Sequence, residues 1–271
     1  MPELPEVETT LRGIEPLVSG QTIRELVLRT EKLRWPLNRS LCRTLPGQTI
    51  SYLERRAKYL LLHCDRGTLI IHLGMTGILR VIPAETTEQK HDHVDLIFTN
   101  GQMLRFTDPR KFGIFSYTEE NPTEHRCLVH LGPEPLSEKF TGAYLFRRSR
   151  HKKQAIKPFI MDQKIVVGVG NIYANEALFR AGIHPARCAG RVGLKRYALL
   201  VKEIRCILQK AIGAGGTTIS DFRQSDGRPG YFDQQLQVYG RADQPCVNCD
   251  AMIRSCRIGQ RSSFYCPRCQ R

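Results

Sequence analysis

The C-terminal part of the chain contains four cysteines whose spacing strongly constrains how it folds. Two pairs with two-residue spacers lie 16 residues apart: Cys246, Cys249, Cys266 and Cys269. A two-residue spacer lets a tight turn direct two sulfurs at one ion, so the pattern predicts one Zn²⁺ with four thiolate ligands. Four thiolates complete the tetrahedral shell, so we expect a structural ion that stabilises a β-hairpin. Two disulfides or four unrelated cysteines are the alternatives.

The chain also carries a large excess of positive charge. Its 271 residues include 41 Lys and Arg against 26 Asp and Glu, which gives a net charge of +15. Such an excess predicts a polyanionic partner, and nucleic acid is favoured over a membrane surface. Six cations and no acid lie within residues 147–157, where they contact phosphate or form a solvated helix face. The predicted hairpin adds Arg254, Arg257 and Arg261.

The chain has no run of about 18 apolar residues, which a membrane-spanning helix needs. Its first residues include several acids and lack the apolar segment of a secretory signal. We therefore expect a soluble intracellular protein that keeps its thiols reduced and has no membrane partner.

The hydrophobic pattern predicts an α+β, multidomain fold. Apolar side chains at spacings of three and four over residues 3–18 predict an amphipathic helix. Short β-branched and aromatic runs between residues 21 and 118 predict a β-sandwich or barrel. Residues 136–225 are predicted to be mainly helical, and residues 244–271 form the small metal module. The clearest helical stretches are residues 143–153, 171–180 and 195–212.

Pro2 is the first candidate catalytic residue. When the initiator methionine is removed, its nitrogen becomes a secondary amine at the start of a helix. An α-amino group has a pKa of about 8, well below that of lysine, so more of it is unprotonated near neutral pH. Such an amine can attack a sugar C1′, and the adjacent Glu3 can serve as general acid and base. Considered alone, Pro2 is explained better as a simple helix start.

Several further residues are candidates with an ordinary structural alternative. Lys58 lies in a predicted strand, where most lysines are exposed and have no catalytic role. Met75, Arg110 and Phe112 lie on predicted turns, where bulky side chains can unstack DNA and fill the space left by an extruded base. Considered alone, these three are explained better as loop residues. Glycines before Asn171 expose backbone N–H groups at a helix start, which is a weak indication of phosphate binding.

Long motifs follow one another in a fixed order from residue 2 to residue 271. They are PELPEVE, HLGMTG, KHDHVDL, TDPRKFG, HLGPEPL, VGVGNIYANEALFRAGIHP, GGTTISDFRQSDGRPGYF and QRSSFYC with the cysteine pairs. Together they resemble the bacterial formamidopyrimidine-DNA glycosylase family. The resemblance implies an N-terminal helix with a β-sandwich over residues 2–132, a helix-two-turn-helix domain over 133–236 and a zinc hairpin over 237–271.

The resemblance also implies a bifunctional base-excision-repair enzyme. Such enzymes remove oxidised purines, chiefly 8-oxoguanine and formamidopyrimidines, and then cut the strand at the abasic site by β,δ-elimination. By resemblance, Pro2 is the nucleophile that forms a Schiff base, and Glu3 is the acid and base beside it. Lys58 matches the proton donor of β-elimination. Arg261 matches the residue assigned to δ-elimination and phosphate binding.

The same resemblance implies a set of DNA contacts. The matching residues are His91, Arg110, Lys152, Lys157, Asn171, Met75 and Phe112. Among them, Met75, Arg110 and Phe112 match the wedge that fills the duplex when the lesion leaves it. Residues 217–231 match a loop that closes over the extruded base. The implied partner is double-stranded DNA with oxidised purines or abasic sites, bound by a monomer in the bacterial cytoplasm. His151 departs from the pattern, because the family often has lysine there.

Two other functions remain as alternatives. A class similar to endonuclease VIII shares the Pro-Glu chemistry but prefers oxidised pyrimidines; it usually begins PEGPE, whereas Leu4 makes this start PELPE. A non-catalytic zinc-ribbon protein that binds DNA explains the charge and the cysteines but leaves Pro2, Glu3 and Lys58 without a role. A small-molecule enzyme explains neither the charge nor the hairpin.

Overall fold

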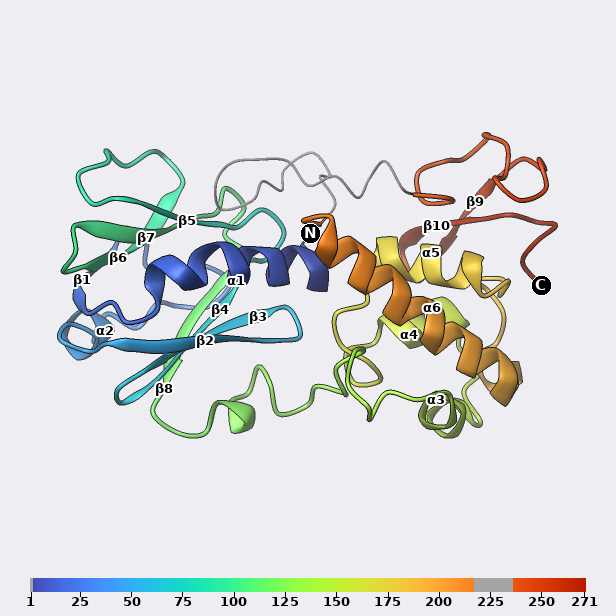
Figure 1. Cartoon of the computed structure of the whole chain (residues 1–271), viewed down its shortest axis with the longest axis horizontal. Helices are drawn as coiled ribbons and strands as arrows, with labels where there is room; N and C mark the ends of the chain where they lie inside the picture. The colour runs from blue at the N-terminus through green and yellow to red at the C-terminus, as the bar shows by residue number, and fades with distance from the viewer. Residues whose placement is uncertain (1, 217–235) are drawn as a thin grey trace. The chain divides into compact units, whose positions relative to one another are not determined.

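The computed structural model describes residues 2–216 and 236–271. These residues form two compact units, one of residues 2–129 with 214–216 and one of residues 130–213 with 236–271 (Figure 1). The C-terminal hairpin lies in the second unit together with the helices.

The first unit begins with helix α1 (Leu4–Val18), close to the predicted range of 3–18. Glu3 is its N-cap and forms a capping box with Glu6, which satisfies backbone N–H groups that have no partner within the helix. Pro5 lies in the first turn, where the missing N–H group costs nothing. The helix buries one apolar face against strands of both sheets of this unit.

Two four-stranded antiparallel sheets make up the rest of the first unit. One sheet has the order β1-β6-β7-β5 and the other β2-β3-β4-β8. Apolar side chains of both sheets and of α1 share one core, so the fold is a sandwich rather than a barrel. The first sheet contains β1 (Ile23–Leu28), β5 (Ile78–Pro83), β6 (Asp92–Phe98) and β7 (Gln102–Thr107). The second contains β2 (Ile50–Arg56), β3 (Tyr59–Cys64), β4 (Gly67–His72) and β8 (Ile114–Thr118). Short helices α2 (Leu41–Thr44) and η1 (Pro122–Glu124) lie between strands or after them.

The second unit consists of helices and one hairpin. Its elements are α3 (Gly142–Ser149), α4 (Ile156–Met161), α5 (Asn171–Arg180), η2 (Ala189–Arg191), α6 (Leu194–Gly213), β9 (Arg254–Ile258) and β10 (Arg261–Tyr265). Helix α6 contacts both α3 and α5, and α5 contacts β10. The sequence predicts a helix through residue 153, but α3 ends at Ser149, because Arg150 has an extended ψ of 139° and His151 a left-handed φ of +62°.

A buried ion network lies in the first sheet, where the sequence pattern gave no indication of it. The guanidinium of Arg105 donates to both carboxylate oxygens of Asp95 at 2.9 Å and also pairs with Asp92 at 3.2 Å. Arg29, which directly follows β1, also pairs with Asp95, with 2.7 Å between its guanidinium nitrogen and the carboxylate oxygen Oδ2. Arg105 also donates to the carbonyl oxygens of Thr86 and Thr87 at 3.0 Å, which fixes the segment that leads to β6.

We expect Arg105→Met to lower the free energy of unfolding of the first unit by about 3 kcal/mol, because it leaves two carboxylates buried without their main partner. Urea unfolding followed by the fluorescence of Trp35, the one tryptophan, measures this. Arg39→Met is the control, since Arg39 is exposed and lies 3.9 Å from an exposed Glu31. Equal unfolding midpoints for the two variants would contradict the prediction.

Candidate active site and metal centre

The start of α1 holds the backbone beside Pro2 in a fixed geometry. The N–H of Glu3 donates to Oε2 of Glu6 at 2.8 Å, and the Glu3 carboxylate accepts the N–H of Glu6. Pro2, Glu3 and Glu6 are all buried. Glu6 therefore supports the candidate pair Pro2-Glu3, a role that the sequence analysis did not assign. The E-x-x-E spacing of a capping box was the available signal.

Lys58 lies in a turn rather than in the strand predicted for it. Arg56 pairs with Tyr59 across β2 and β3, so Ala57 and Lys58 form a two-residue hairpin turn. Ala57 has φ +57°, which is uncommon for a residue with a side chain, and its carbonyl oxygen accepts from Arg55 at 3.1 Å. Lys58 is 4% exposed. The turn thus places a buried lysine at the tip of a rigid hairpin.

His72 is a buried neutral histidine near this hairpin. Its Nδ1 accepts the N–H of Gly74 at 2.9 Å, and its ring lies 4.7 Å from that of Tyr59. Burial lowers its pKa to about 4, and the positive charges of Lys58 and Arg34 act in the same direction. Burial also raises the pKa of Tyr59 to about 12. Both groups are therefore uncharged at neutral pH.

The three predicted wedge residues come from two turns that touch. Met75 follows Gly74 in the β4–β5 turn, and a Cβ at Gly74 would lie 2.6 Å from the backbone of Phe112. Only glycine allows this approach, and Gly74 also has φ +66°. The Arg110 guanidinium lies 4.8 Å from the centre of the Phe112 ring, which is 43% exposed. The structure therefore brings together two turns that are far apart in the sequence.

The basic segment of the second unit surrounds an open hollow. It is lined by His151, Lys152, Lys153, Cys188, Gly190 and Arg191. Lys152 is exposed, as a phosphate contact requires. Asn171 begins α5, and its buried Oδ1 has no hydrogen-bond partner among the described residues.

Lys157 is fully buried and anchors the hairpin. Its Nζ donates to the carbonyl oxygen of Ser262 and to Oγ of Ser263, each at 2.7 Å. These serines follow Arg261, which is exposed and comes directly after a two-residue turn with φ +56° and +61°. Such values are typical of a type I′ hairpin turn. The phosphate contact expected of Lys157 stays a prediction; in the structure its ammonium group holds β10.

Glu176 is a second anchor that the sequence analysis missed. Its buried carboxylate accepts backbone N–H groups of Gln237, Val238 and Tyr239 at distances from 2.8 to 3.1 Å. Asn175, beside it in α5, accepts the N–H of Phe264 at 2.8 Å. A charged residue inside a mostly apolar helix was the only signal in the sequence.

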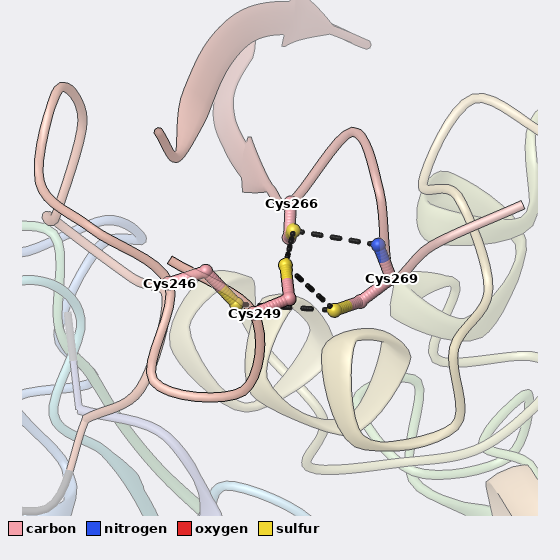
Figure 2. Close-up of side chains that lie close together, drawn as sticks. All are labelled: Cys246, Cys249, Cys266 and Cys269. Atoms are coloured by element: carbon pink, nitrogen blue, oxygen red, sulfur yellow. Dashed lines mark hydrogen bonds between the residues drawn. The ribbon is translucent and has the colours of Figure 1, made fainter. Parts of the chain in front are cut away.

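The four cysteines predicted as zinc ligands form one cluster in the structure. Their sulfurs all lie within 4.8 Å of one another, and the closest pairs are 3.4, 3.5 and 3.9 Å apart (Figure 2). Tetrahedral zinc with Zn–S bonds of about 2.3 Å separates its sulfurs by roughly 3.8 Å, so the spacing fits. Backbone N–H groups of Asn248 and Cys269 donate to two of the sulfurs at 3.4 Å. The donor set fits one structural Zn²⁺.

Comparison with known proteins agrees with this arrangement. Residues 1–115 match the formamidopyrimidine-DNA glycosylase N-terminal domain, residues 131–223 match the H2TH domain of the same enzyme, and residues 243–271 match a zinc finger found in FPG and IleRS. The formamidopyrimidine-DNA glycosylase of Syntrophotalea carbinolica is 57% identical over 271 residues, 100% of both chains. The chain belongs to the formamidopyrimidine-DNA glycosylase family. The formamidopyrimidine-DNA glycosylase of Nitrosococcus oceani is 55% identical over 270 residues, again 100% of both chains.

Solved structures of formamidopyrimidine-DNA glycosylases have the same fold. A Lactococcus lactis FPG mutant in complex with DNA containing Fapy-dG superposes with a TM-score of 0.91, at 34% identity and 100% coverage of both chains. The MutM (FPG) protein from Thermus thermophilus superposes with a TM-score of 0.87, at 38% identity, and the match covers 99% of this chain and 98% of that one.

Within the described residues, no helix is long and apolar enough to cross a membrane.

We expect Cys249→Ser to lose zinc during dialysis against EDTA, because three thiolates leave one coordination position without a ligand. The wild-type protein should retain one ion per chain, measured by plasma mass spectrometry. Cys256→Ser is the matched control, since Cys256 lies in β9 outside the sulfur cluster. Equal zinc retention by both variants would argue against the four-thiolate site.

The buried His72 should make the first unit sensitive to acid. As the pH falls below about 6.5, an unfolded histidine binds a proton that folded His72 binds only near pH 4, so stability is lost between these values. Between pH 7 and pH 5 the wild-type protein should lose about 2 kcal/mol more than His72→Gln. Urea unfolding at both pH values, followed by Trp35 fluorescence, measures the difference; identical losses would refute it.

Proposed function

We propose that this protein is a base-excision-repair DNA glycosylase and abasic-site lyase that acts on oxidised purines, namely 8-oxoguanine and formamidopyrimidines, in double-stranded DNA. The observation that carries the proposal is the similarity over the whole chain to formamidopyrimidine-DNA glycosylases, with all three domains matched. Solved relatives were crystallised with DNA containing Fapy-dG or an abasic site. A net charge of +15 suits a DNA-binding enzyme.

The chemistry that we propose starts at Pro2. The lone pair of its nitrogen attacks C1′ of the damaged nucleotide. The glycosidic bond breaks, and the base leaves with the electron pair of that bond and takes up a proton. The C1′–O4′ bond then breaks, O4′ leaves with its electron pair and takes up a proton, and the proline nitrogen forms an iminium with C1′. The iminium acidifies the C2′ proton, whose removal expels the 3′-phosphate; a second elimination expels the 5′-phosphate. Glu3 beside Pro2 exchanges protons in these steps, Lys58 assists the first elimination, and Arg261 binds phosphate and assists the second.

Several features of the structure support these roles. The capping box fixes the backbone of Glu3, and the tight β2–β3 turn fixes Lys58. Arg261 is exposed at the end of the hairpin, where a phosphate can reach it. Pro2 acts only when it is the N-terminal residue, since an attached methionine turns its nitrogen into an amide. The Zn²⁺ crosslinks the hairpin that presents Arg261.

The DNA contacts belong to the same proposal. The exposed Lys152 and the helix start at Asn171 bind phosphate, together with His91 and Arg110, while the buried Lys157 holds the hairpin strand that follows Arg261. Met75, Arg110 and Phe112 fill the space that the extruded base leaves. The closing loop expected over residues 217–231 lies outside the described residues. We further propose that the enzyme works as a monomer in the bacterial cytoplasm.

Borohydride trapping tests the Pro2 route. The processed wild-type protein should form a covalent adduct with a duplex bearing 8-oxoguanine opposite cytosine, because borohydride reduces the iminium. Insertion of one lysine between Met1 and Pro2 should abolish the adduct while DNA binding persists, because the proline nitrogen is then an amide. Pro2→Gly should weaken trapping strongly.

A duplex with thymine glycol serves as the parallel substrate. Trapping only on that duplex would assign the protein to oxidised pyrimidines instead. Tight binding without an adduct on either duplex would leave a DNA-binding protein without lyase chemistry.

A further inference from the structure

Asp108 is a fully buried carboxylate in a turn that otherwise faces solvent. It directly follows β7 and is 0% exposed, whereas Pro109, Arg110 and Lys111 are exposed. Its Oδ1 accepts the hydroxyl of Thr76 at 2.7 Å, and its Oδ2 accepts the N–H of Gly113 at 2.7 Å. The N–H of Arg110 makes a longer bond to Oδ1, at 3.3 Å. One side chain therefore joins the two turns that carry the wedge residues.

The backbone of Asp108 makes further bonds to the segment at the start of β6. Its N–H donates to the carbonyl oxygen of His91 at 3.0 Å, and its own carbonyl oxygen lies 3.0 Å from Nε2 of His93. His93 is buried, and its pKa is lowered mainly by that burial, so it is neutral at neutral pH. With Nε2 protonated, His93 donates this bond. Asp108 thus contacts all three segments of the first unit in which we place DNA contacts.

The two wedge turns are also packed backbone against backbone. A Cβ at Gly74 would lie 2.6 Å from the N atom of Gly113 and from the carbonyl carbon of Phe112. Met75 is the neighbour of both Gly74 and Thr76, so the close approach and the hydrogen bond fix it from its two sides. The Thr76–Asp108 bond therefore restrains the backbone of Met75 relative to that of Phe112.

We propose that Asp108 is a positioning residue for opening the DNA duplex, and that its bond to Thr76 sets Met75 relative to Arg110 and Phe112 so that the three side chains enter the duplex as one rigid group. This rests on the proposed wedge function of those three residues. Extruding a paired base costs a few kcal/mol, and a wedge ordered in advance avoids a further loss of conformational entropy on binding. A carboxylate suits the task because it accepts several strong hydrogen bonds at once.

Substitutions at Thr76 test the positioning role more specifically than Asp108→Asn, because Asp108→Asn disturbs several hydrogen bonds together. Thr76→Val removes the hydroxyl and preserves the shape of the side chain, and Thr76→Ser keeps the hydroxyl. Thr22→Val is the matched control: Thr22 lies 3.1 Å from the hydroxyl of Thr49 in the same unit, away from the two turns. It controls for a general loss of stability.

Two reactions are measured under single-turnover conditions for each variant. One is excision of 8-oxoguanine opposite cytosine, which requires a paired base to be extruded. The other is cleavage of a preformed abasic site, which has no base to extrude. A 2-aminopurine reporter next to the lesion follows unstacking directly. We expect Thr76→Val to lower the ratio of excision to cleavage about tenfold, the value of one hydrogen bond to a charged group, and to slow the reporter signal.

Thr76→Ser should restore both the ratio and the reporter signal, and Thr22→Val should leave them unchanged. An unchanged ratio in Thr76→Val, or the same decrease in Thr22→Val, would overturn the positioning role while the proposed function stands. A wild-type protein that neither excises 8-oxoguanine nor unstacks the reporter would overturn the proposed function, and this inference with it.

Discussion

A charged group buried away from water costs several kcal/mol unless hydrogen bonds and opposite charges surround it. Both units of this protein contain such groups, and three of them hold a segment with a proposed function. Glu6 fixes the start of α1 beside Pro2, Asp108 joins the two wedge turns, and Lys157 binds the strand that follows Arg261. Because these bonds are costly to break, they order the segments before DNA binds.

The C-terminal hairpin shows why both a metal and such anchors are needed. Its apolar cluster consists of a few residues, among them two of the cysteines themselves, which is too small a core for independent stability. The Zn²⁺ site closes one end, and Lys157, Asn175 and Glu176 attach the hairpin and the segment before it to helices α4 and α5. The exposed Arg261 is thereby presented on a rigid support.

The first unit combines exposed and buried ionisable groups in a small space. Lys58 is held at a tight turn, and the neighbouring His72 stays neutral because it is buried and faces positive charges. Phe112 and Arg110, by contrast, are exposed on a turn whose base is fixed by Asp108. A rigid sandwich therefore carries the proposed reactive groups in its interior and the proposed DNA contacts on its surface.

The sequence by itself determined the features that depend on local spacing: the four-cysteine site, the amphipathic helix α1 and the family to which the motifs belong. A two-residue spacer or a 3.6-residue period acts over a few residues, so it can be recognised without a structure. The early end of α3 at Ser149, the turn position of Lys58 and the burial of Lys157 were not predictable in this way. The bond between Thr76 and Asp108 joins residues 32 positions apart. Such contacts depend on strand register and packing, which only the tertiary structure decides.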